Sequence, residues 1–216
     1  MMRGGLFLDL DGTLADSLGA MRLAYDRFLA GFGRRGGDAE FAALNGPPLP
    51  EVVARLAAAH GLEGPPEGLL ARYQGLVDAV YDDAGPMPGA AALIAAARGA
   101  GRAVAVVTSN SRARAARWLA RRGIDHDLVV AGGEAARGKP APDPYLAALA
   151  ATGCAAAASI AVEDAPQGAA AALAAGLETW VLQPGGGPWD GPAVAGRVAR
   201  LDMLCAVAGR PPGGTP

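Results

Sequence analysis

Lysine is almost absent from this sequence. Of its 19 basic residues 18 are arginine, so Lys139 is the only lysine in a chain of 216 residues. The composition is shifted toward Ala, Gly, Pro and Arg, a bias that would replace lysine wherever arginine serves as well. We therefore expect Lys139 to stand where the compact charge of an ammonium group is needed, because a guanidinium group differs from it in shape and donor geometry.

Bulky and sulfur-containing side chains are also scarce. Aromatic residues make up 5% of the chain, and 84 of its positions are Ala or Gly, so most of its hydrophobic surface is small. The two cysteines, Cys154 and Cys205, stand apart in no metal-binding spacing, which excludes a disulfide framework and predicts reduced core thiols. A mean hydropathy of +0.21 is typical of globular proteins and excludes the disordered and collagen-like classes.

The sequence also lacks a long run of one charge and a long apolar run. Its net charge is −2 and its basic residues are dispersed, so we expect no nucleic acid and no membrane among its partners. The uncharged stretch 144–162 is broken by Thr152 and Gly153, which predicts helix, turn and strand rather than a transmembrane segment. The first apolar run, Leu6–Leu10, is too short for a signal peptide and contains Asp9. These absences predict a cytoplasmic protein whose partners are small molecules. We expect it to be a monomer or weak dimer.

Short apolar runs alternate with Ala-rich stretches over most of the chain. The runs are typical of strands buried on both faces of a parallel sheet, and from residue 89 onward the patterns of helix and strand alternate. The predicted strands are Leu6–Leu10, Ala103–Val107, Leu128–Ala131, Ile160–Val162 and Thr179–Leu182. This order predicts an α/β protein with a doubly wound, Rossmann-like parallel sheet.

One long helical segment interrupts the alternation directly after the first strand. Residues 15–86 show only helical hydrophobic patterns, separated by turns rich in Gly and Pro, and the turn Gly85–Gly89 is predicted to return the chain to the sheet. We therefore expect two domains. Residues 1–14 and 87–216 would form a Rossmann-like catalytic core, and residues 15–86 an inserted all-α cap domain.

Acidic residues end the first and fourth predicted strands, at the sheet edge where α/β proteins bind ligands. Asp9 and Asp11 lie on one face of the first strand, and such close like charges are costly unless a cation or a shared proton relieves them. One of them is then expected to bind a metal or act as a nucleophile, and the other to carry a proton. Glu163 and Asp164 supply oxygen ligands suited to Mg²⁺.

Hydroxyl and amide side chains end the second predicted strand. Thr108, Ser109 and Asn110 precede a helix that is expected to begin at about Arg112. Hydroxyl and backbone N–H groups at a helix N-terminus form a site for an anion, although the same residues also serve as a simple helix cap.

The lone lysine follows the third predicted strand. Gly133-x-x-x-x-Gly138-Lys139 is close to a phosphate-binding P-loop, but Pro140 replaces the Ser or Thr that would bind magnesium, so a nucleotide triphosphatase is a minor hypothesis. What remains is a lysine in a rigid turn, directed at acidic or phosphoryl oxygens. The Lys139–Pro140 bond is expected to be cis, since tight functional turns use that isomer.

These four motifs, in their order and spacing, resemble those of the haloacid dehalogenase (HAD)-like hydrolase superfamily. The matching segments are Asp9-Leu10-Asp11-Gly12-Thr13, Thr108-Ser109-Asn110, Lys139-Pro140 and Glu163-Asp164. The resemblance covers the whole chain, including a helical cap after the first motif. It implies a Mg²⁺-dependent phosphatase that hydrolyses a small phosphorylated metabolite through an aspartyl-phosphate, similar to phosphoglycolate phosphatases.

The resemblance also implies a role for each motif residue. Asp9 would be the nucleophile, and Asp11 would protonate the leaving alcohol and then activate water. Asp9, Asp164 and the backbone carbonyl of Asp11 would hold Mg²⁺, with Glu163 helping to place the metal or its water. The residues implied for phosphate binding are Thr108, Ser109, Asn110 and Lys139.

Other members of the superfamily provide alternatives. Asp11 argues against a dehalogenase, which has no alcohol to protonate, and the cap has no lysine with which a phosphonatase would form a Schiff base. Glu163-Asp164-x-x-x-Gly168 resembles β-phosphoglucomutases, but the cap segment 44–51 lacks the Arg that would hold a second phosphate. A β-phosphoglucomutase-like phosphosugar mutase stays an alternative, as does a catalytically idle HAD-like binding protein, which the complete set of motif residues disfavours.

Overall fold

The computed structural model describes residues 3–44 and 46–212. The chain divides into two compact units, unit 1 from residues 1–15 and 86–216 and unit 2 from residues 16–85, whereas the sequence placed the divisions after residues 14 and 86. The role of unit 2 as a cap stays a prediction. Asn45 lies outside the described residues. It belongs to the segment 44–51, whose lack of an Arg argues against the mutase alternative.

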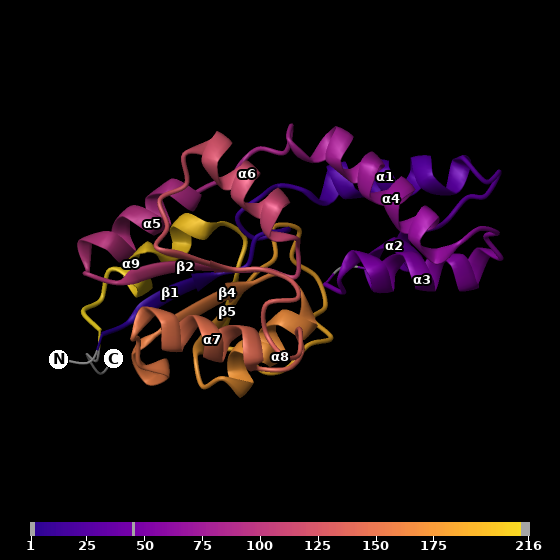
Figure 1. Cartoon of the computed structure of the whole chain (residues 1–216). Helices are drawn as coiled ribbons and strands as arrows, with labels where there is room; N and C mark the ends of the chain where they lie inside the picture. Colours follow the sequence, from indigo (N-terminus) through magenta and orange to yellow (C-terminus); the bar gives the residue numbers. More distant parts are fainter. Residues whose placement is uncertain (1–2, 45, 213–216) are drawn as a thin grey trace. The chain divides into compact units, whose positions relative to one another are not determined.

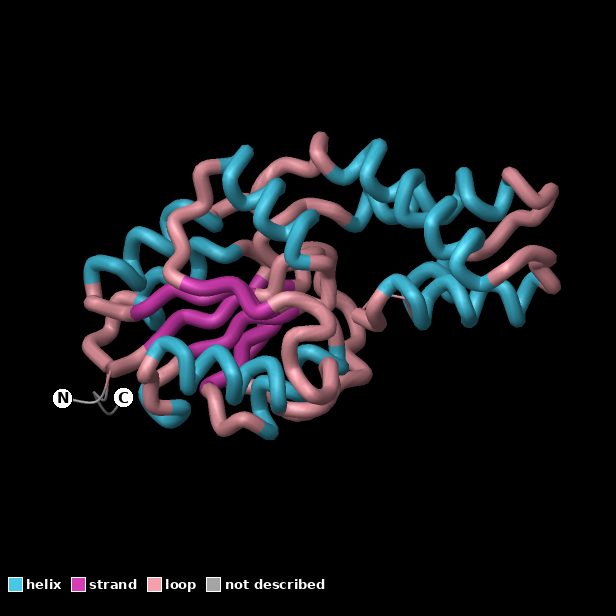
Figure 2. Tube along the Cα trace, in the orientation of Figure 1, coloured by secondary structure: helices cyan, strands magenta, loops and turns pink. Residues whose placement is uncertain are grey.

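Unit 1 is built on one parallel sheet (Figures 1 and 2). Its strands in the described part of the chain are β1 (Gly5–Leu8), β2 (Ala103–Val107), β3 (Leu128–Val130), β4 (Ile160–Glu163), β5 (Glu178–Leu182) and β6 (Gly196–Val198). They lie in the order β3-β2-β1-β4-β5-β6, and each pairs with its neighbour in parallel. The predicted doubly wound, Rossmann-like α/β fold is thereby confirmed.

Helices cover both faces of this sheet. One face carries α5 (Ala90–Gly99), α6 (Arg112–Arg122) and α9 (Cys205–Ala208), and the other carries α7 (Asp143–Thr152) and α8 (Pro166–Ala174) (Figure 1). The core beneath α7 and α8 combines a few large side chains, such as Phe7 and Tyr145, with many alanines. Small side chains let these helices lie close to the strands, so the scarcity of bulky residues is compatible with a dense core.

Most predicted strand ends agree with the structure to within one residue, and two differences are larger. β6 was not predicted, because this edge strand has only three residues, Arg197 in it is exposed, and no apolar run marks it. β1 ends at Leu8 rather than Leu10, because the carbonyl of Leu10 already accepts hydrogen bonds from the N–H groups of Leu14 and Ala15 in a tight turn. That turn places Asp9 at the strand end.

Unit 2 consists of α1 (Leu18–Ala30), α2 (Asp38–Ala43), α3 (Leu49–His60) and α4 (Pro66–Tyr81) among its described residues. Phe28 of α1 meets Tyr73 of α4 edge to face, with ring centroids 5.0 Å apart. Glu40 of α2 accepts hydrogen bonds from the hydroxyl group of Tyr25 and from Nε2 of His60, the latter at 2.9 Å. This carboxylate joins α1, α2 and α3. No helix in the described part of either unit combines the length and apolarity needed to cross a membrane.

The chain leaves and re-enters unit 1 at neighbouring points. Ala15 forms an antiparallel bridge with Pro86, and the N–H of Met87 donates to the carbonyl of Leu14 at 2.8 Å. On the unit 2 side, the N–H of Asp16 donates to the carbonyl of Gly85 at 2.9 Å. The two connecting segments therefore run side by side.

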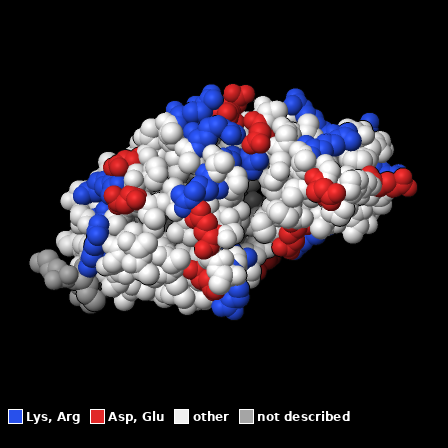
Figure 3. Space-filling model, viewed as in Figure 1, with Lys and Arg blue, Asp and Glu red and all other residues white. Residues whose placement is uncertain are grey.

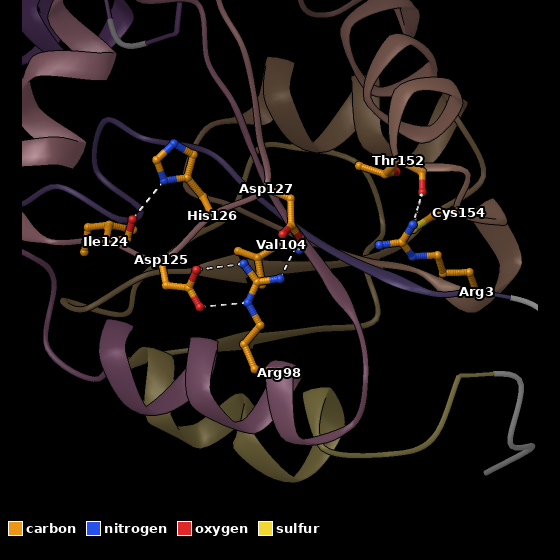
Figure 4. Close-up of polar contacts among 9 residues, drawn as sticks. All are labelled: Arg3, Arg98, Val104, Ile124, Asp125, His126, Asp127, Thr152 and Cys154. Carbon is orange, nitrogen blue, oxygen red and sulfur yellow. Dashed lines mark hydrogen bonds and ion pairs between the residues drawn. The ribbon is translucent and has the colours of Figure 1, made fainter.

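An arginine ties the amino ends of two strands in unit 1 (Figure 4). Arg98 of α5 donates to both oxygens of Asp125 at 2.9 Å and to Asp127 at 2.6 Å, and Asp127 also accepts from the N–H of Val104 in β2. On the face that Figure 3 shows, basic side chains lie among acidic ones.

A second arginine fixes the C-terminal segment. The side chain of Arg102 is buried and donates to the carbonyls of Ala208 at 2.9 Å, Ala158 at 2.7 Å and Arg210 at 3.1 Å. Buried carbonyl groups need donors. Arg102 therefore joins its own segment to two others, the segment around Ala158 and the C-terminal segment that contains Ala208 and Arg210.

Replacing Arg102 by Met is expected to lower the free energy of unfolding by about 2–4 kcal/mol, because buried carbonyls lose their donors. Urea denaturation followed by circular dichroism measures this change. Arg197→Met is the matched control at an exposed position and should change stability by less than about 0.5 kcal/mol. A loss of less than about 1 kcal/mol for Arg102→Met would contradict the assignment.

Candidate active site

The motif residues gather at the carboxyl edge of the sheet in unit 1. Asp9 directly follows β1, Thr108 directly follows β2, and Glu163 is the last residue of β4. Lys139 lies in the loop between β3 and α7. Since β2, β1 and β4 are adjacent and parallel, residues separated by more than a hundred positions come together.

Lys139 is the centre of this group. Its Nζ lies 2.6 Å from Oδ1 of Asp9, 2.6 Å from Oε1 of Glu163 and 2.8 Å from the carbonyl oxygen of Val107. An ammonium group has three donors, and each finds an acceptor. The Lys139 side chain is only 4% exposed, so these contacts replace its hydration. The bond from Lys139 to Pro140 is cis, as expected.

Burial and charge act in opposite directions on the pKa values of this pair. Burial alone would lower the pKa of Lys139, but the carboxylates of Asp9 and Glu163 outweigh it and hold that pKa above its ordinary value. Burial also raises the pKa of Asp9 well above its ordinary value; Lys139 opposes this shift, and the neighbouring carboxylates of Glu163, Asp164 and Asp11 add to it. One ammonium thus faces more negative charge than it can balance.

The carboxylates form a set of oxygen ligands that fits a divalent cation. One oxygen from each of Asp9, Glu163 and Asp164 lies within 4.8 Å of the others. Hard oxygen donors of this kind suit Mg²⁺, which takes one or two carboxylates together with water and phosphate oxygens. The side chain of Asp11 points instead to Asn110, whose Nδ2 donates to its Oδ2 at 3.0 Å. A contribution of Asp11 to such a site through its backbone carbonyl stays a prediction.

Two glycines make room for the acidic side chains. Gly12 has φ +77°, which favours glycine, and a Cβ atom there would lie 2.2 Å from Oδ2 of Asp164. A Cβ atom at Gly168, in the first turn of α8, would lie 2.0 Å from Oε2 of Glu163. Both backbone segments approach a carboxylate more closely than any residue with a side chain allows.

Tyr145 of α7 belongs to the site, although the sequence did not single it out. Its hydroxyl group donates to Oε1 of Glu163, the oxygen that also accepts from Lys139, and its ring centroid lies 5.3 Å from Nζ of Lys139. Burial raises the pKa of Tyr145 well above its ordinary value, so the phenol stays a donor. The available indication was a phenolic hydroxyl group on the largely apolar core face of α7.

The segment after β2 is fixed by its own polar groups. Oγ1 of Thr108 accepts from the N–H of Asn110 at 3.0 Å, and Ser111, rather than Thr108, caps α6 by accepting from the N–H of Arg114. Gly132 packs against the carbonyl of Ser109, where a Cβ atom would lie 2.3 Å away. The helix begins at Arg112, as the sequence predicted. Phosphate binding by Thr108, Ser109 and Asn110 stays a prediction.

Known proteins with similar sequences match nearly the whole chain. The family model described as haloacid dehalogenase-like hydrolase matches residues 6–182. The chain is 34% identical to hexitol phosphatase A of Escherichia coli (strain K12) over 207 residues, which are 93% of this chain and 89% of that protein. It is 31% identical to a plasmid-encoded phosphoglycolate phosphatase of Cupriavidus necator over 208 residues, 94% of this chain and 90% of that protein.

A shorter match and a solved structure point the same way. The chain is 42% identical to protein CbbY of Rhodobacter capsulatus over 105 residues, so this match spans 46% of each protein, about half its length. The crystal structure of CbbY from Rhodobacter sphaeroides in complex with phosphate superposes with a TM-score of 0.79 at 25% identity, covering 94% of this chain and 96% of that one. The resemblance carried by the four motifs is confirmed: the chain belongs to the haloacid dehalogenase-like hydrolase family.

Proposed function

We propose that this protein is a Mg²⁺-dependent phosphatase that hydrolyses a small phosphorylated metabolite through a phosphoaspartate on Asp9. Its family and its similarity to relatives named as phosphatases make it a phosphoric monoester hydrolase of small phosphorylated metabolites. The observation that carries the finer proposal is the environment of Asp9. This buried carboxylate lies at a strand end, held by an ammonium group and beside a set of oxygen ligands.

Asp9 and Asp11 would divide the chemistry between them. Lys139 holds Oδ1 of Asp9 and so orients the carboxylate that attacks phosphorus. A new bond forms between a carboxylate oxygen of Asp9 and phosphorus while the bond from phosphorus to the alcohol oxygen breaks, and Asp11 gives that oxygen its proton. Asp11, now ionised, then takes a proton from the water that attacks the phosphoaspartate. Inorganic phosphate leaves and Asp9 is restored.

The remaining motif residues would bind Mg²⁺ and the phosphoryl group and so balance the negative charge of the site. Bound Mg²⁺ would neutralise the repulsion between the anionic nucleophile and the phosphoryl group. The residues proposed to hold it are Asp9, Asp164 and the backbone carbonyl of Asp11. Glu163, which accepts hydrogen bonds from Lys139 and Tyr145, is proposed to help place the metal or its water. The residues proposed to bind the phosphoryl group are Thr108, Ser109, Asn110 and Lys139.

The proposed substrate class is a small ester such as phosphoglycolate. The similarity to the phosphoglycolate phosphatase of Cupriavidus necator supports it, as does the absence of arginine from the segment 44–51, where a phosphosugar mutase would hold a second phosphate. Unit 2, acting as a cap, would select among such esters. The protein is proposed to work in the cytoplasm, as a monomer or weak dimer.

The purified protein with Mg²⁺ is expected to release phosphate from p-nitrophenyl phosphate and, with a higher kcat/KM, from phosphoglycolate. The panel that checks this also contains sugar phosphates, hexitol phosphates, nucleoside monophosphates and pyrophosphate. EDTA should stop turnover and added Mg²⁺ restore it, because the carboxylate set needs a cation to accept a phosphoryl anion. Formation of glucose 6-phosphate from β-glucose 1-phosphate would show a mutase instead, and turnover of none of the panel would show an idle binding protein.

Asp9→Asn should reduce kcat by at least about 10³-fold, because a neutral amide cannot act as the nucleophile. Steady-state phosphate release measures the loss. Asp125→Asn is the matched control, since this carboxylate lies at the amino edge of the sheet with Arg98 (Figure 4). If Asp9→Asn kept more than a trace of activity, phosphoaspartate chemistry on Asp9 would be wrong.

Lys139→Arg should lower kcat/KM by about 10²-fold or more. The planar guanidinium group cannot place its charge against Asp9, Glu163 and the Val107 carbonyl at the same time. Arg137→Lys, the reverse exchange in the same loop, should retain activity because the Arg137 side chain is 72% exposed and pairs with Asp143. Full activity of Lys139→Arg would contradict the need for a point charge.

A further inference from the structure

A row of three hydrogen-bonded side chains leads from α6 to Asp11. Nη1 of Arg114 donates to Oδ1 of Asn110 at 2.8 Å, and Nδ2 of Asn110 donates to Oδ2 of Asp11 at 3.0 Å. All three residues belong to unit 1, and Arg114 is buried. A charged residue outside the four motifs thus lies two hydrogen bonds from the proposed catalytic acid.

The chemistry of this row allows one orientation of the Asn110 amide. A guanidinium group has only donors, so Arg114 must face the amide oxygen. The backbone N–H of Ser111 donates to the same oxygen at 2.9 Å. The amide nitrogen therefore faces Asp11 and meets a carboxyl oxygen that accepts. A half-turn of the amide would set oxygen against oxygen and lose the contacts on both sides.

The backbone around Asn110 is held as firmly as its side chain. Its N–H donates to Oγ1 of Thr108 at 3.0 Å, and its carbonyl accepts from the N–H of Gly132 at 2.8 Å. Arg114 lies in the first turn of α6, where its own N–H donates to the cap residue Ser111. The backbones of Asn110 and Arg114 are therefore both fixed by hydrogen bonds, as is required of side chains that orient a catalytic group.

We propose that Arg114 is a positioning residue that acts through Asn110 to hold Asp11 in the direction needed for proton transfer to the leaving alcohol. The proposal rests on the proposed function, in which Asp11 protonates that alcohol. Fixing Oδ2 of Asp11 sets the direction of its other carboxyl oxygen, which gives up the proton as the bond from phosphorus to the alcohol oxygen breaks. The alcohol takes the proton and Asp11 becomes a carboxylate.

The leaving group provides the test. p-Nitrophenyl phosphate releases a phenolate that is stable without a proton, whereas β-glycerophosphate releases an alkoxide that needs one. kcat/KM covers the steps up to release of that group, so the later hydrolysis of the phosphoaspartate does not enter it. Arg114→Met, similar in length but without donors, is expected to lower the ratio of kcat/KM for β-glycerophosphate to that for p-nitrophenyl phosphate about tenfold.

A double-mutant cycle shows whether Arg114 acts through Asn110. Asn110→Ala should lower the same ratio about tenfold or more, and adding Arg114→Met to it should lower the ratio by less than about twofold further, because no amide is left to orient. Arg98→Met is the matched control at the amino edge of the sheet (Figure 4) and should keep the wild-type ratio.

Four other results would overturn the inference, and one of them would also overturn the proposed function. If Arg114→Met lowers kcat/KM for both substrates alike, or lowers the ratio a further tenfold in the Asn110→Ala background, the inference is wrong while the proposed function stands. An equal loss for both substrates in Asn110→Ala would limit this residue to phosphate binding alone and also overturn the inference. A wild-type protein with no Mg²⁺-dependent turnover of either substrate would overturn the proposed function and the inference with it.

Discussion

The buried ammonium group of Lys139 connects three neighbouring strands of the sheet. It donates to Asp9 after β1, to Glu163 at the end of β4 and to the carbonyl of Val107 at the end of β2. Removing one partner of such a buried pair costs about 3–5 kcal/mol, because the other charge is left without compensation. The same residue therefore stabilises the edge of the sheet and keeps the carboxylates close enough to share a cation.

The glycines near this cluster show how a biased composition still carries information. Among 32 glycines, Gly12, Gly132 and Gly168 lie where a Cβ atom would collide with Asp164, with the Ser109 carbonyl and with Glu163 respectively. At these positions glycine is required by close approach of the backbone to a polar group. Because glycine is abundant throughout the chain, the sequence alone could not distinguish these three positions from the other glycines.

The sequence was sufficient for the fold class and for the residues that depend on local pattern. Asp9, Lys139 and Glu163 could be predicted together because a parallel sheet collects its strand ends at one edge. Tyr145 and Arg114 could not, because their roles depend on contacts between segments distant in sequence. In the sequence, Tyr145 is one more apolar position of a core helix, and Arg114 is one of several arginines in α6. β6 was missed because a three-residue edge strand leaves too little pattern.

The paired connecting segments at Ala15 and Pro86 have a consequence for how such a protein can evolve. Because the chain departs from the sheet unit and returns to it at adjacent residues, a segment of any length whose own ends lie close together can be accommodated there without disturbing a strand. The substrate selectivity proposed for unit 2 and the chemistry proposed for the carboxyl edge are then encoded in separable stretches of gene. One can be exchanged, lengthened or lost while the other is inherited unchanged.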